Sequence, residues 1–338
     1  MQNYTREKFN QFVQAIATLN GLSVAAVMSK FNVTPSVQQT MEGKIQESSE
    51  FLKAINIIGV TEQQGSKLGL GITGPIASTT DTTTQEREPI DPTTLDEIGY
   101  MCTQTNYDTF IPYSKLDAWA GHPQFARLVN QAIIQRIALD RIMIGFNGTS
   151  RAATSNRATN PLLQDVNKGW LQKIRDAGSA HWVKETDSGT NQVKYGASVE
   201  FKTLDAIVVD AVNNLVEPWY REDNQLVAVL GRNLLADKYF PLVNTVQAPT
   251  EQKAAYDLIV SQKRVGNLQA VSVPYFPANA ILITRLDNLS IYYQRGAQRR
   301  SVIDNPKRDR IETYQSSNDA FVVEDYGCTA LIENITAV

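Results

Sequence analysis

The longest helical pattern in the chain is PQFARLVNQAIIQRIALDRIMI, residues 123–144. Apolar side chains recur in it at the spacing of one helix face, namely at Phe125, Leu128, Val129, Ala132, Ile133 and Ile137. Pro123 suits the first turn of a helix, and Gly145 suits a left-handed stop. At about 1.5 Å per residue, the predicted helix is about 33 Å long and lies along a core. Such a helix occurs in many mixed folds, so it indicates architecture and leaves function open.

The composition is that of an ordinary folded protein. The chain has 338 residues, 42% of them hydrophobic and 20% charged, and its net charge is −3. This length allows one large or two intertwined domains, and the slight negative charge argues against coating nucleic acid by bulk electrostatics. Two cysteines exclude a disulfide framework and indicate a reducing compartment. Without a signal-peptide pattern or a run approaching about 18 apolar residues, we expect no membrane contact.

The first 55 residues indicate three helices. The first ends at Asn20-Gly21, Ser23 can cap the second, and a break at residues 32–36 precedes the third. The third helix is mostly polar and has little apolar surface of its own, so we expect it to need a partner.

The character of the chain changes between residues 59 and 113. Glycines alternate with Leu and Ile, a Ser/Thr run follows, and strands are predicted at Tyr100–Thr105 and Tyr107–Tyr113. Over residues 71–110, seven acidic residues stand against one basic residue, Arg87. A structureless loop of this length is unusual within a compact monomer, so we predict an extended hairpin that reaches another subunit.

The second half of the chain is dominated by strand patterns. A helical stripe at Leu204–Leu215 comes before most of them. The predicted strands are Leu226–Leu230, Leu268–Tyr275, Ala280–Leu286, Leu289–Gln294, Ser301–Asp304, Arg310–Tyr314, Ala320–Asp325 and Thr329–Ile335. Helices early and strands late indicate an α+β fold.

The sequence contains no recognisable catalytic, cofactor-binding or metal-binding motif. Gly69–Gly74 matches G-x-G-x-x-G, but Pro75 and a Ser/Thr run follow where a dinucleotide site needs a helix. His122 and His181 are the only histidines, and they form no zinc-ligand spacing. Because catalytic triads are spatial, an enzyme with an unseen site stays open as an alternative.

Basic residues gather late in the chain. Residues 259–310 carry nine basic and three acidic residues. They could form a solvated face, a nucleic-acid site, or a surface that complements the acidic segment 71–110 within one chain or between subunits. The nucleic-acid reading is weaker, since Tyr292 and Tyr293 are the only adjacent stacking candidates.

Long continuous stretches of the sequence carry a family resemblance. They are TPSVQQTMEGKIQESSEFLKAINI from Thr34, GLGITGPIAS from Gly69, QTNYDTFIPYSKLDAWA from Gln104, IALDRIMIGFNGTS from Ile137, NPLLQDVNKGWLQK from Asn160, LLADKYFPLVN from Leu234, RLDNLSIYYQ from Arg285 and KRDRIE from Lys307. In these stretches the chain resembles the major capsid protein precursors of peduovirus-type (P2-like) tailed phages and related prophages. The resemblance runs nearly end to end and thins at about residues 177–200.

The resemblance implies an α+β fold of the Hong Kong 97 type, with a long spine helix, an extended hairpin loop, and peripheral and axial domains. It divides the chain into a scaffold-like N-terminal segment at 1–31 that is removed on maturation, an N-terminal arm at 32–58, the extended loop at 59–113, the peripheral domain at 114–199 with its spine helix at 123–144, the axial domain at 200–270, and return strands of the peripheral domain at 271–338.

The function implied by the resemblance is that of a major capsid protein, with no enzymatic activity and no cofactor. Copies assemble as hexamers and pentamers of an icosahedral tailed-phage head that encloses double-stranded DNA. The implied partners are further copies of the chain, a scaffold and maturation protease, a portal protein and DNA through non-specific contacts, with no membrane. The implied location is the virion, after assembly in the bacterial host cytoplasm. The alternatives are another virion assembly protein, such as a tube or decoration protein, and an enzyme.

Two sets of site residues follow from the resemblance and the charge pattern. The resemblance places proteolytic processing at Lys30, Phe31 and Asn32, where the sequence itself shows only a helix break. On the predicted loop, we expect Glu86 and Glu88 to contact basic residues of a neighbouring subunit. The candidate basic residues are Arg299, Arg300, Lys307, Arg308 and Arg310.

Overall fold

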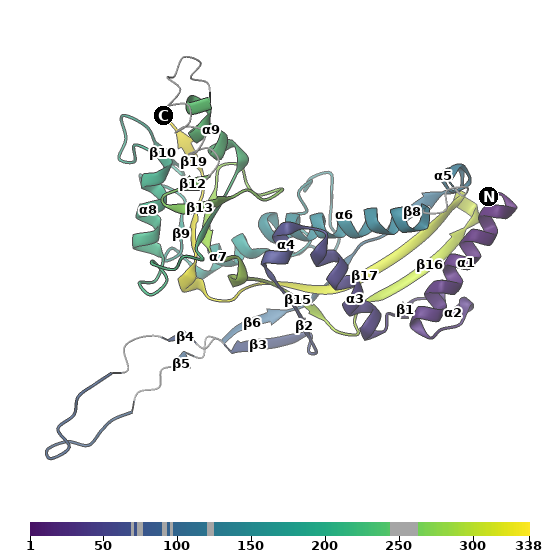
Figure 1. Cartoon of the computed structure of the whole chain (residues 1–338), viewed down its shortest axis with the longest axis horizontal. Helices are drawn as coiled ribbons and strands as arrows, with labels where there is room; N and C mark the ends of the chain where they lie inside the picture. Colours follow the sequence, from purple (N-terminus) through teal and green to yellow (C-terminus); the bar gives the residue numbers. More distant parts are fainter. Residues whose placement is uncertain (69–70, 73–76, 90–92, 95–96, 120–124, 244–262) are drawn as a thin grey trace.

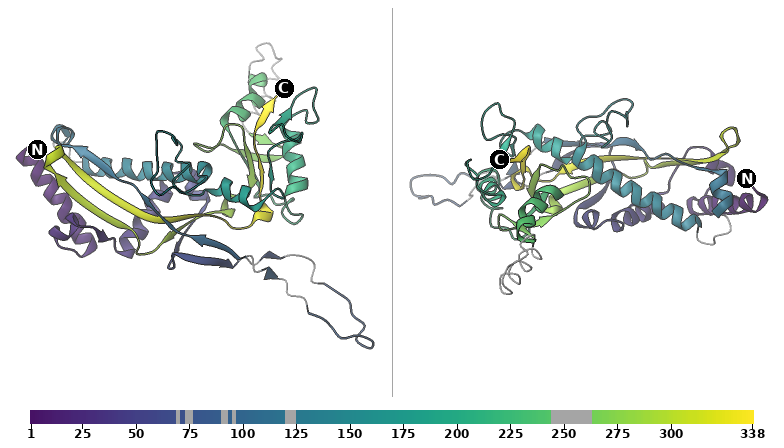
Figure 2. Two further views of the ribbon diagram at one scale, coloured as in Figure 1. Left: turned by 180° about the vertical axis from the view of Figure 1, so that it is seen from behind. Right: turned by 90° about the horizontal axis from the view of Figure 1, so that it is seen from above.

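The structure, a computed structural model, describes residues 1–68, 71–72, 77–89, 93–94, 97–119, 125–243 and 263–338. Figure 1 shows an elongated main body with the N-terminus at one end and a narrow arm leaving near the other. A second body, which carries the C-terminus, stands upright beside the end from which the arm leaves. Figure 2 shows the same arrangement from behind and from above.

A seven-stranded sheet runs along the main body around one 14-residue strand, β17 (Arg310–Val323). The strands β16 (Arg299–Asn305) and β15 (Leu289–Gln294) pair antiparallel with one edge of β17, one after the other. The other edge pairs with β8 (Thr109–Pro112) and β7 (Thr103–Asn106). Two short strands complete the sheet, β1 (Phe31–Asn32) beside β16 and β2 (Asn56–Val60) beside β15.

One long helix, α6 (Phe125–Asn147), lies along this sheet (Figure 1). Its C-terminal half packs with α7 (Trp170–Ala177) and α4 (Glu50–Ala54) in the main core. Aromatic rings fill that core, with centroid separations of 5.2 Å between Phe146 and Trp170 and 5.3 Å between Trp170 and Phe321. The indole Nε1 of Trp170 donates to the backbone oxygen of Ser290 at 3.0 Å, so this large side chain is buried without an unsatisfied donor.

The N-terminal helices form a separate apolar cluster at the far end of the sheet. The first, α1 (Asn3–Asn20), ends at Gly21, whose φ of 63° is the predicted left-handed stop. Ser23 caps α2 (Val24–Met28) by accepting from the Ala26 N–H at 3.3 Å, which was also predicted. These helices pack with Val302 and Ile311 of the sheet and with α5 (Tyr113–Trp119).

The mostly polar third helix of the sequence is two helices, α3 (Pro35–Glu47) and α4, separated at Ser48 and Ser49. As expected, it depends on a partner within the chain. The buried Gln38 side chain donates to the Gln294 backbone oxygen at 3.0 Å and accepts from the Gly296 N–H at 2.8 Å. These two bonds fix α3 to the turn between β15 and β16.

The second body contains a six-stranded sheet drawn from distant parts of the chain. Its order is β12 (Arg264–Val265), β13 (Leu268–Val271), β11 (Val227–Leu230), β14 (Ile281–Thr284), β18 (Ala330–Ile332) and β9 (Trp182–Val183). The helices α8 (Leu204–Leu215) and α9 (Arg232–Val243) belong to this body, and β10 (Val193–Tyr195) pairs with β19 (Ile335–Ala337). The 3-10 turns are η1 (Leu286–Asn288), η2 (Pro306–Arg308) and η3 (Tyr326–Cys328).

Sheet membership differs from the domain boundaries expected from the resemblance. The strands β7 and β8 belong to the main sheet, so residues 103–112, which were expected in the loop at 59–113, are part of the main body. The strands β9 and β10 lie within 114–199, and β14, β18 and β19 lie within 271–338, yet all five belong to the second body. Short apolar runs do not reveal which distant strand they pair with, which is why the linear boundaries missed this exchange.

The helix expected at 123–144 is α6, but the stop expected at Gly145 was wrong because the helix continues to Asn147. Residues 123 and 124 lie outside the described part of the chain, as does most of the Gly69–Gly74 motif. A Cβ at position 145 would stand 2.2 Å from the Cζ3 atom of Trp170. Glycine is therefore required here for close approach of Trp170 and not to end the helix.

The apolar stripe of α6 is only partly buried. Ile137 and the residues that follow it face the core, whereas Leu128 is 49% exposed and Ala132 is also exposed. The N-terminal half of the helix therefore leaves apolar surface uncovered in the single chain.

The substitution Gly145→Ala tests this close approach. We expect it to lower the free energy of unfolding by about 1–3 kcal/mol, because the added methyl group overlaps the Trp170 ring. The matched control is Gly43→Ala in α3, where nothing lies within 4 Å of the new methyl group. That control should be neutral or stabilise by up to about 1 kcal/mol through helix propensity. Urea denaturation measures both, and equal effects at the two sites would refute the packing role.

Candidate inter-subunit surfaces

An arm made of two antiparallel ladders projects from the main body (Figure 1). The inner ladder pairs β3 (Gln64–Leu68) with β6 (Glu97–Met101), and the outer one pairs β4 (Gly71–Ile72) with β5 (Thr93–Thr94). Residues 77–89, beyond the ladders, are all exposed. There the Asp81 carboxylate accepts from the Thr83 side chain and N–H, and these bonds lower its pKa.

The root of the arm is fixed in the main sheet. Cys102, fully buried, directly follows β6 and packs with Tyr292, Ala320 and Val322. Its N–H donates to the Gln63 backbone oxygen at 2.8 Å, which closes the base of the hairpin. The rings of Tyr100 and Tyr292 pack edge to face, with their centroids 5.1 Å apart. The arm thus extends from a base that is packed in the main sheet, and its residues 77–89 are all exposed.

A buried charge cluster joins this base to the helices. Arg141 of α6 forms a fork with Glu42 of α3, one bond of which is 3.1 Å, and its Nη2 lies 3.2 Å from Oδ1 of Asp319 in β17. All three side chains are at most 3% exposed. Burial by itself lowers the pKa of the Arg141 guanidinium. The neighbouring Asp319 and Glu42 carboxylates outweigh this effect and raise that pKa.

The cluster extends to Tyr107, which lies between β7 and β8, and to Ser317 of β17. The Tyr107 hydroxyl donates to Oδ2 of Asp319 at 3.2 Å, and the Ser317 hydroxyl donates to the same oxygen at 2.9 Å. Burial, with the Asp319 charge, raises the pKa of Tyr107, which keeps this hydroxyl protonated as a donor. Sequence reasoning missed the cluster. The available signal was Arg141 itself, a charge inside the apolar run IALDRIMIGF.

The structure separates the predicted basic residues into two patches. Arg299 is exposed at the start of β16, whereas Lys307 and Arg308 are exposed in η2 after its end. Seven residues of strand place these patches about 20 Å apart. Glu86 and Glu88 are exposed on the arm, which points away from the hairpin between β16 and β17 (Figure 1). The structure therefore does not bring the predicted acids and bases together within one chain.

The remaining two predicted bases are less accessible. Arg310 is committed within its own chain, because its Nη2 lies 2.6 Å from Oε1 of Glu312 and its guanidinium stacks 4.4 Å from the Phe110 ring centre. Hydrogen bonds from Tyr314 and from Arg310 lower the pKa of Glu312. Arg300 is half-buried, and burial lowers the pKa of its guanidinium.

The expected processing region lies where the N-terminal helices join the sheet. Lys30 is exposed between α2 and β1, while Phe31 is buried in the N-terminal cluster. In β1, Phe31 pairs with Arg300 and Asn32 pairs with Arg299. A bond after Lys30 is thus reachable from solvent, and the next two residues are held in the sheet.

The two thiols are free, buried and far from nucleophilic. Burial raises the pKa of Cys102 and of Cys328 to about 11, so both are protonated at neutral pH. Over the described ranges, no group of three or more His, Cys, Asp or Glu side chains is placed to hold a metal ion. Among the described helices, none combines the length and apolar character that a bilayer crossing requires.

Comparison with known proteins defines the class to which this architecture belongs. A chain from the procapsid of satellite phage P4, in a structure that includes the size determination (Sid) protein, superposes with a TM-score of 0.82 at 48% identity. That match covers 100% of this chain and 99% of the other, and it places the fold among phage capsid proteins.

Sequence comparison gives the family. The model of the phage major capsid protein, P2 family, matches residues 8–335. The capsid protein of Escherichia phage P2 is 51% identical over 341 residues, covering 99% of this chain and 95% of that protein. The major capsid protein of Serratia phage KSP20 is 46% identical over 343 residues, covering 99% and 98%. The chain belongs to the P2 family of phage major capsid proteins, a family of structural virion proteins that form homo-oligomeric capsids.

Replacing Arg141 by Met tests the buried charge cluster. We expect the free energy of unfolding to fall by about 3–5 kcal/mol, because Glu42 and Asp319 lose their shared cation while both stay buried. Lys53→Met is the control, since Lys53 forms an exposed pair with Glu50 at 2.6 Å and should change stability by less than about 0.5 kcal/mol. Chemical denaturation followed by far-UV circular dichroism measures both. An Arg141 variant as stable as the control would contradict the account.

Proposed function

We propose that this major capsid protein builds an icosahedral tailed-phage head as hexamers and pentamers that enclose double-stranded DNA. The observation that supports this proposal most directly is the arm, which projects from the main body and whose residues 77–89 are all exposed. An ordered base with an unsupported tip suits a contact with another subunit. Family membership supports the same conclusion.

In the proposed shell, each part of the molecule has a Hong Kong 97-type counterpart. The main body, with α6 as its spine helix, is the peripheral domain, and the upright second body is the axial domain around the symmetry axes. The arm is the extended loop, which reaches over a neighbouring subunit. Apolar burial between subunits supplies most of the free energy of assembly, and charge pairing sets the register.

We propose that Glu86 and Glu88 of the arm contact a basic patch of the neighbouring subunit. Arg299 and the Lys307–Arg308 pair are the accessible candidates, because their side chains are exposed. Arg300 and Arg310, also predicted, are half-buried, and Arg310 already pairs with Glu312. Each exposed pair contributes only about 0.2–1 kcal/mol, but every copy in the shell repeats it.

We also propose that residues 1–31 act as a scaffold-associated segment that a maturation protease removes near Lys30, Phe31 and Asn32. Two features support this proposal. Residues 1–28 contain α1 and α2, whose apolar cluster is separate from the main core, and Lys30 is exposed. Further proposed partners are a scaffold, a portal protein and DNA through non-specific contacts, with assembly in the bacterial host cytoplasm.

Charge reversal tests the arm contact. We expect Arg299→Glu or the double variant Lys307→Glu/Arg308→Glu to reduce the yield of closed shells, because like charges would face Glu86 and Glu88. When one of these variants lowers the yield, adding Glu86→Lys and Glu88→Lys to it should restore part of that yield. Velocity sedimentation and negative-stain microscopy measure it, with Lys53→Glu as an exposed control that should assemble normally.

The rescue decides between a specific contact and a general charge effect. If the Arg299→Glu variant and the Lys307→Glu/Arg308→Glu variant both form normal shells, the proposed pairing is wrong. Impaired assembly that the arm reversal fails to rescue would do the same, since the charges would then act elsewhere. Neither outcome would affect family membership, which rests on the sequence.

A further inference from the structure

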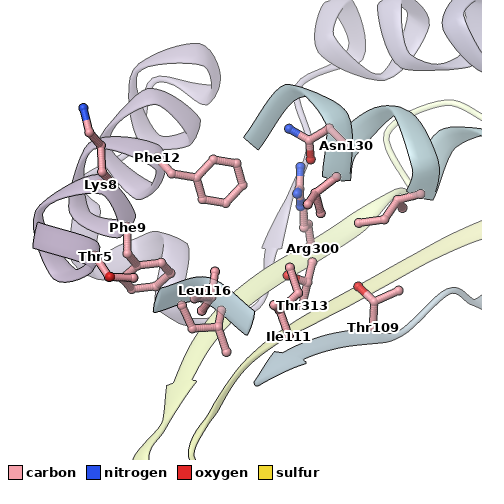
Figure 3. A pocket seen from close by; sticks show the side chains of 13 residues that line it. Thr5, Lys8, Phe9, Phe12, Thr109, Ile111, Leu116, Asn130, Arg300 and Thr313 are labelled. Atoms are coloured by element: carbon pink, nitrogen blue, oxygen red, sulfur yellow. The ribbon is translucent and has the colours of Figure 1, made fainter. Parts of the chain in front are cut away.

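An apolar groove lies between the N-terminal half of α6, the helix α1 and the face of the main sheet formed by β8, β17 and β16 (Figure 3). It comprises three adjoining cavities of about 110, 360 and 560 Å³, and Thr109 and Ile133 line all three. In Figure 3, Phe9 and Phe12 extend from α1 on one side, while Asn130 marks α6 on the other. The groove is therefore continuous along the part of α6 that does not reach the core.

Among the described residues, none covers the outer face of α6 beside the groove. Leu128 is 49% exposed, Ala132 is exposed, and Val129 and Ile133 are half-buried. Further along the same stripe, Ile137 is 4% exposed. Apolar side chains at helix spacing that stay partly in water over nearly two turns, residues 128–133, are a feature of a binding surface.

A cation without a partner lies within this apolar surface. Arg300 lines two of the three cavities, and its guanidinium points from β16 toward α6 (Figure 3). Its Nε is buried and makes no hydrogen bond, and its side chain forms no ion pair with any described residue. Adjacent Arg299, by contrast, is exposed to solvent. A buried guanidinium nitrogen without an acceptor is unfavourable until a carboxylate or similar group reaches it.

The charged residues around the groove are mostly basic. The basic side chains that line the three cavities are Lys8, Lys44, Lys115, Arg136, Arg157 and Arg300, against the acids Asp108 and Asp140. Asp140 pairs with Arg136 at 2.6 Å, which leaves five basic side chains and Asp108. The groove is thus strongly basic in a chain whose net charge is −3.

We propose that this groove binds an acidic amphipathic helix of a partner protein, with a partner carboxylate on Arg300. Apolar side chains at helix spacing would cover Val129 and Ile133, which is the helix-in-groove mode of recognition. The part of α6 that does not reach the core, residues 127–136, accommodates about three helical turns. The exposed acidic arm of another copy is not suited to this role, because Ala77 and Pro89 are the only apolar residues among 77–89.

The test uses the full chain and a synthetic 14-residue helix with Leu on one face and Glu on the other. Fluorescence anisotropy measures its binding to the wild type and to two matched variants, Arg300→Met and Arg299→Met. We expect Arg300→Met to weaken binding at least about tenfold, because a charged hydrogen bond is lost. Arg299→Met should stay within about twofold, since that side chain lies outside the groove. A scrambled peptide of the same composition should bind at least about tenfold more weakly.

A second measurement separates loss of binding from loss of folding. Arg300→Met removes a half-buried cation whose Nε has no hydrogen bond, so its thermal midpoint should stay close to that of the wild type. Equal peptide binding by the Arg300 and Arg299 variants, or by the scrambled peptide, would overturn the proposal. Self-association of the chain that Arg300→Met abolishes, with no peptide binding, would assign the groove to a second copy and overturn it too. Shell formation is scored separately, so failure of this proposal leaves the proposed capsid function standing.

Discussion

The buried contact of Arg141 with Glu42 and Asp319 is the interaction on which the rest of the molecule depends. It joins α6 to α3 and to β17, and both residues that Arg141 contacts are acidic. β17 in turn pairs with β7, β8, β15 and β16, and the arm leaves the sheet through β7. A buried ion pair adds little net stability over an apolar substitute, yet it tolerates no missing partner. The cluster therefore fixes the relative placement of helix, sheet and arm more than it strengthens the core.

That placement leaves the single chain with surfaces that only other molecules can cover. The arm projects from a rigid base, with an exposed acidic tip, and the basic patches lie on a separate part of the main body. The apolar stripe of α6 enters the core at Ile137 but remains in water before it. A subunit of a shell has these properties, since its binding surfaces become buried only on assembly. Rigid placement of such surfaces is the main contribution that the fold makes to the function.

The features that could be predicted from sequence are those determined by local chemistry. The spacing of apolar residues located α6 and α8, and the Asn20-Gly21 and Ser23 signals located the ends of α1 and α2. β17 was predicted as two strands because residues 315–319, QSSND, are polar. Those residues are largely buried in a continuous strand, since Arg141, Tyr107 and Asn167 satisfy the polar groups of Asp319. Such satisfaction comes from partners far along the chain, which periodicity does not reveal.

The same limit explains the other differences. Gly145 was predicted to end a helix because a glycine at that position commonly does, whereas its role depends on Trp170, 25 residues later. The second body collects β9, β14 and β18 from three separate regions, which no linear boundary can represent. For the candidate surfaces, the sequence showed which charged residues were available for a contact between subunits. It could not show that Arg300 is half-buried in a groove or that Arg310 already pairs with Glu312.

Formation of closed shells from further copies of this chain is the property on which the proposed contacts depend, and the assembly state of the chain reports it. Velocity sedimentation with negative-stain microscopy on the expressed full chain, with and without the neighbouring scaffold and protease genes, measures that state. The account predicts closed shells, with loss of about 30 N-terminal residues when the protease is present. A soluble monomer under every condition, scaffold included, would contradict it.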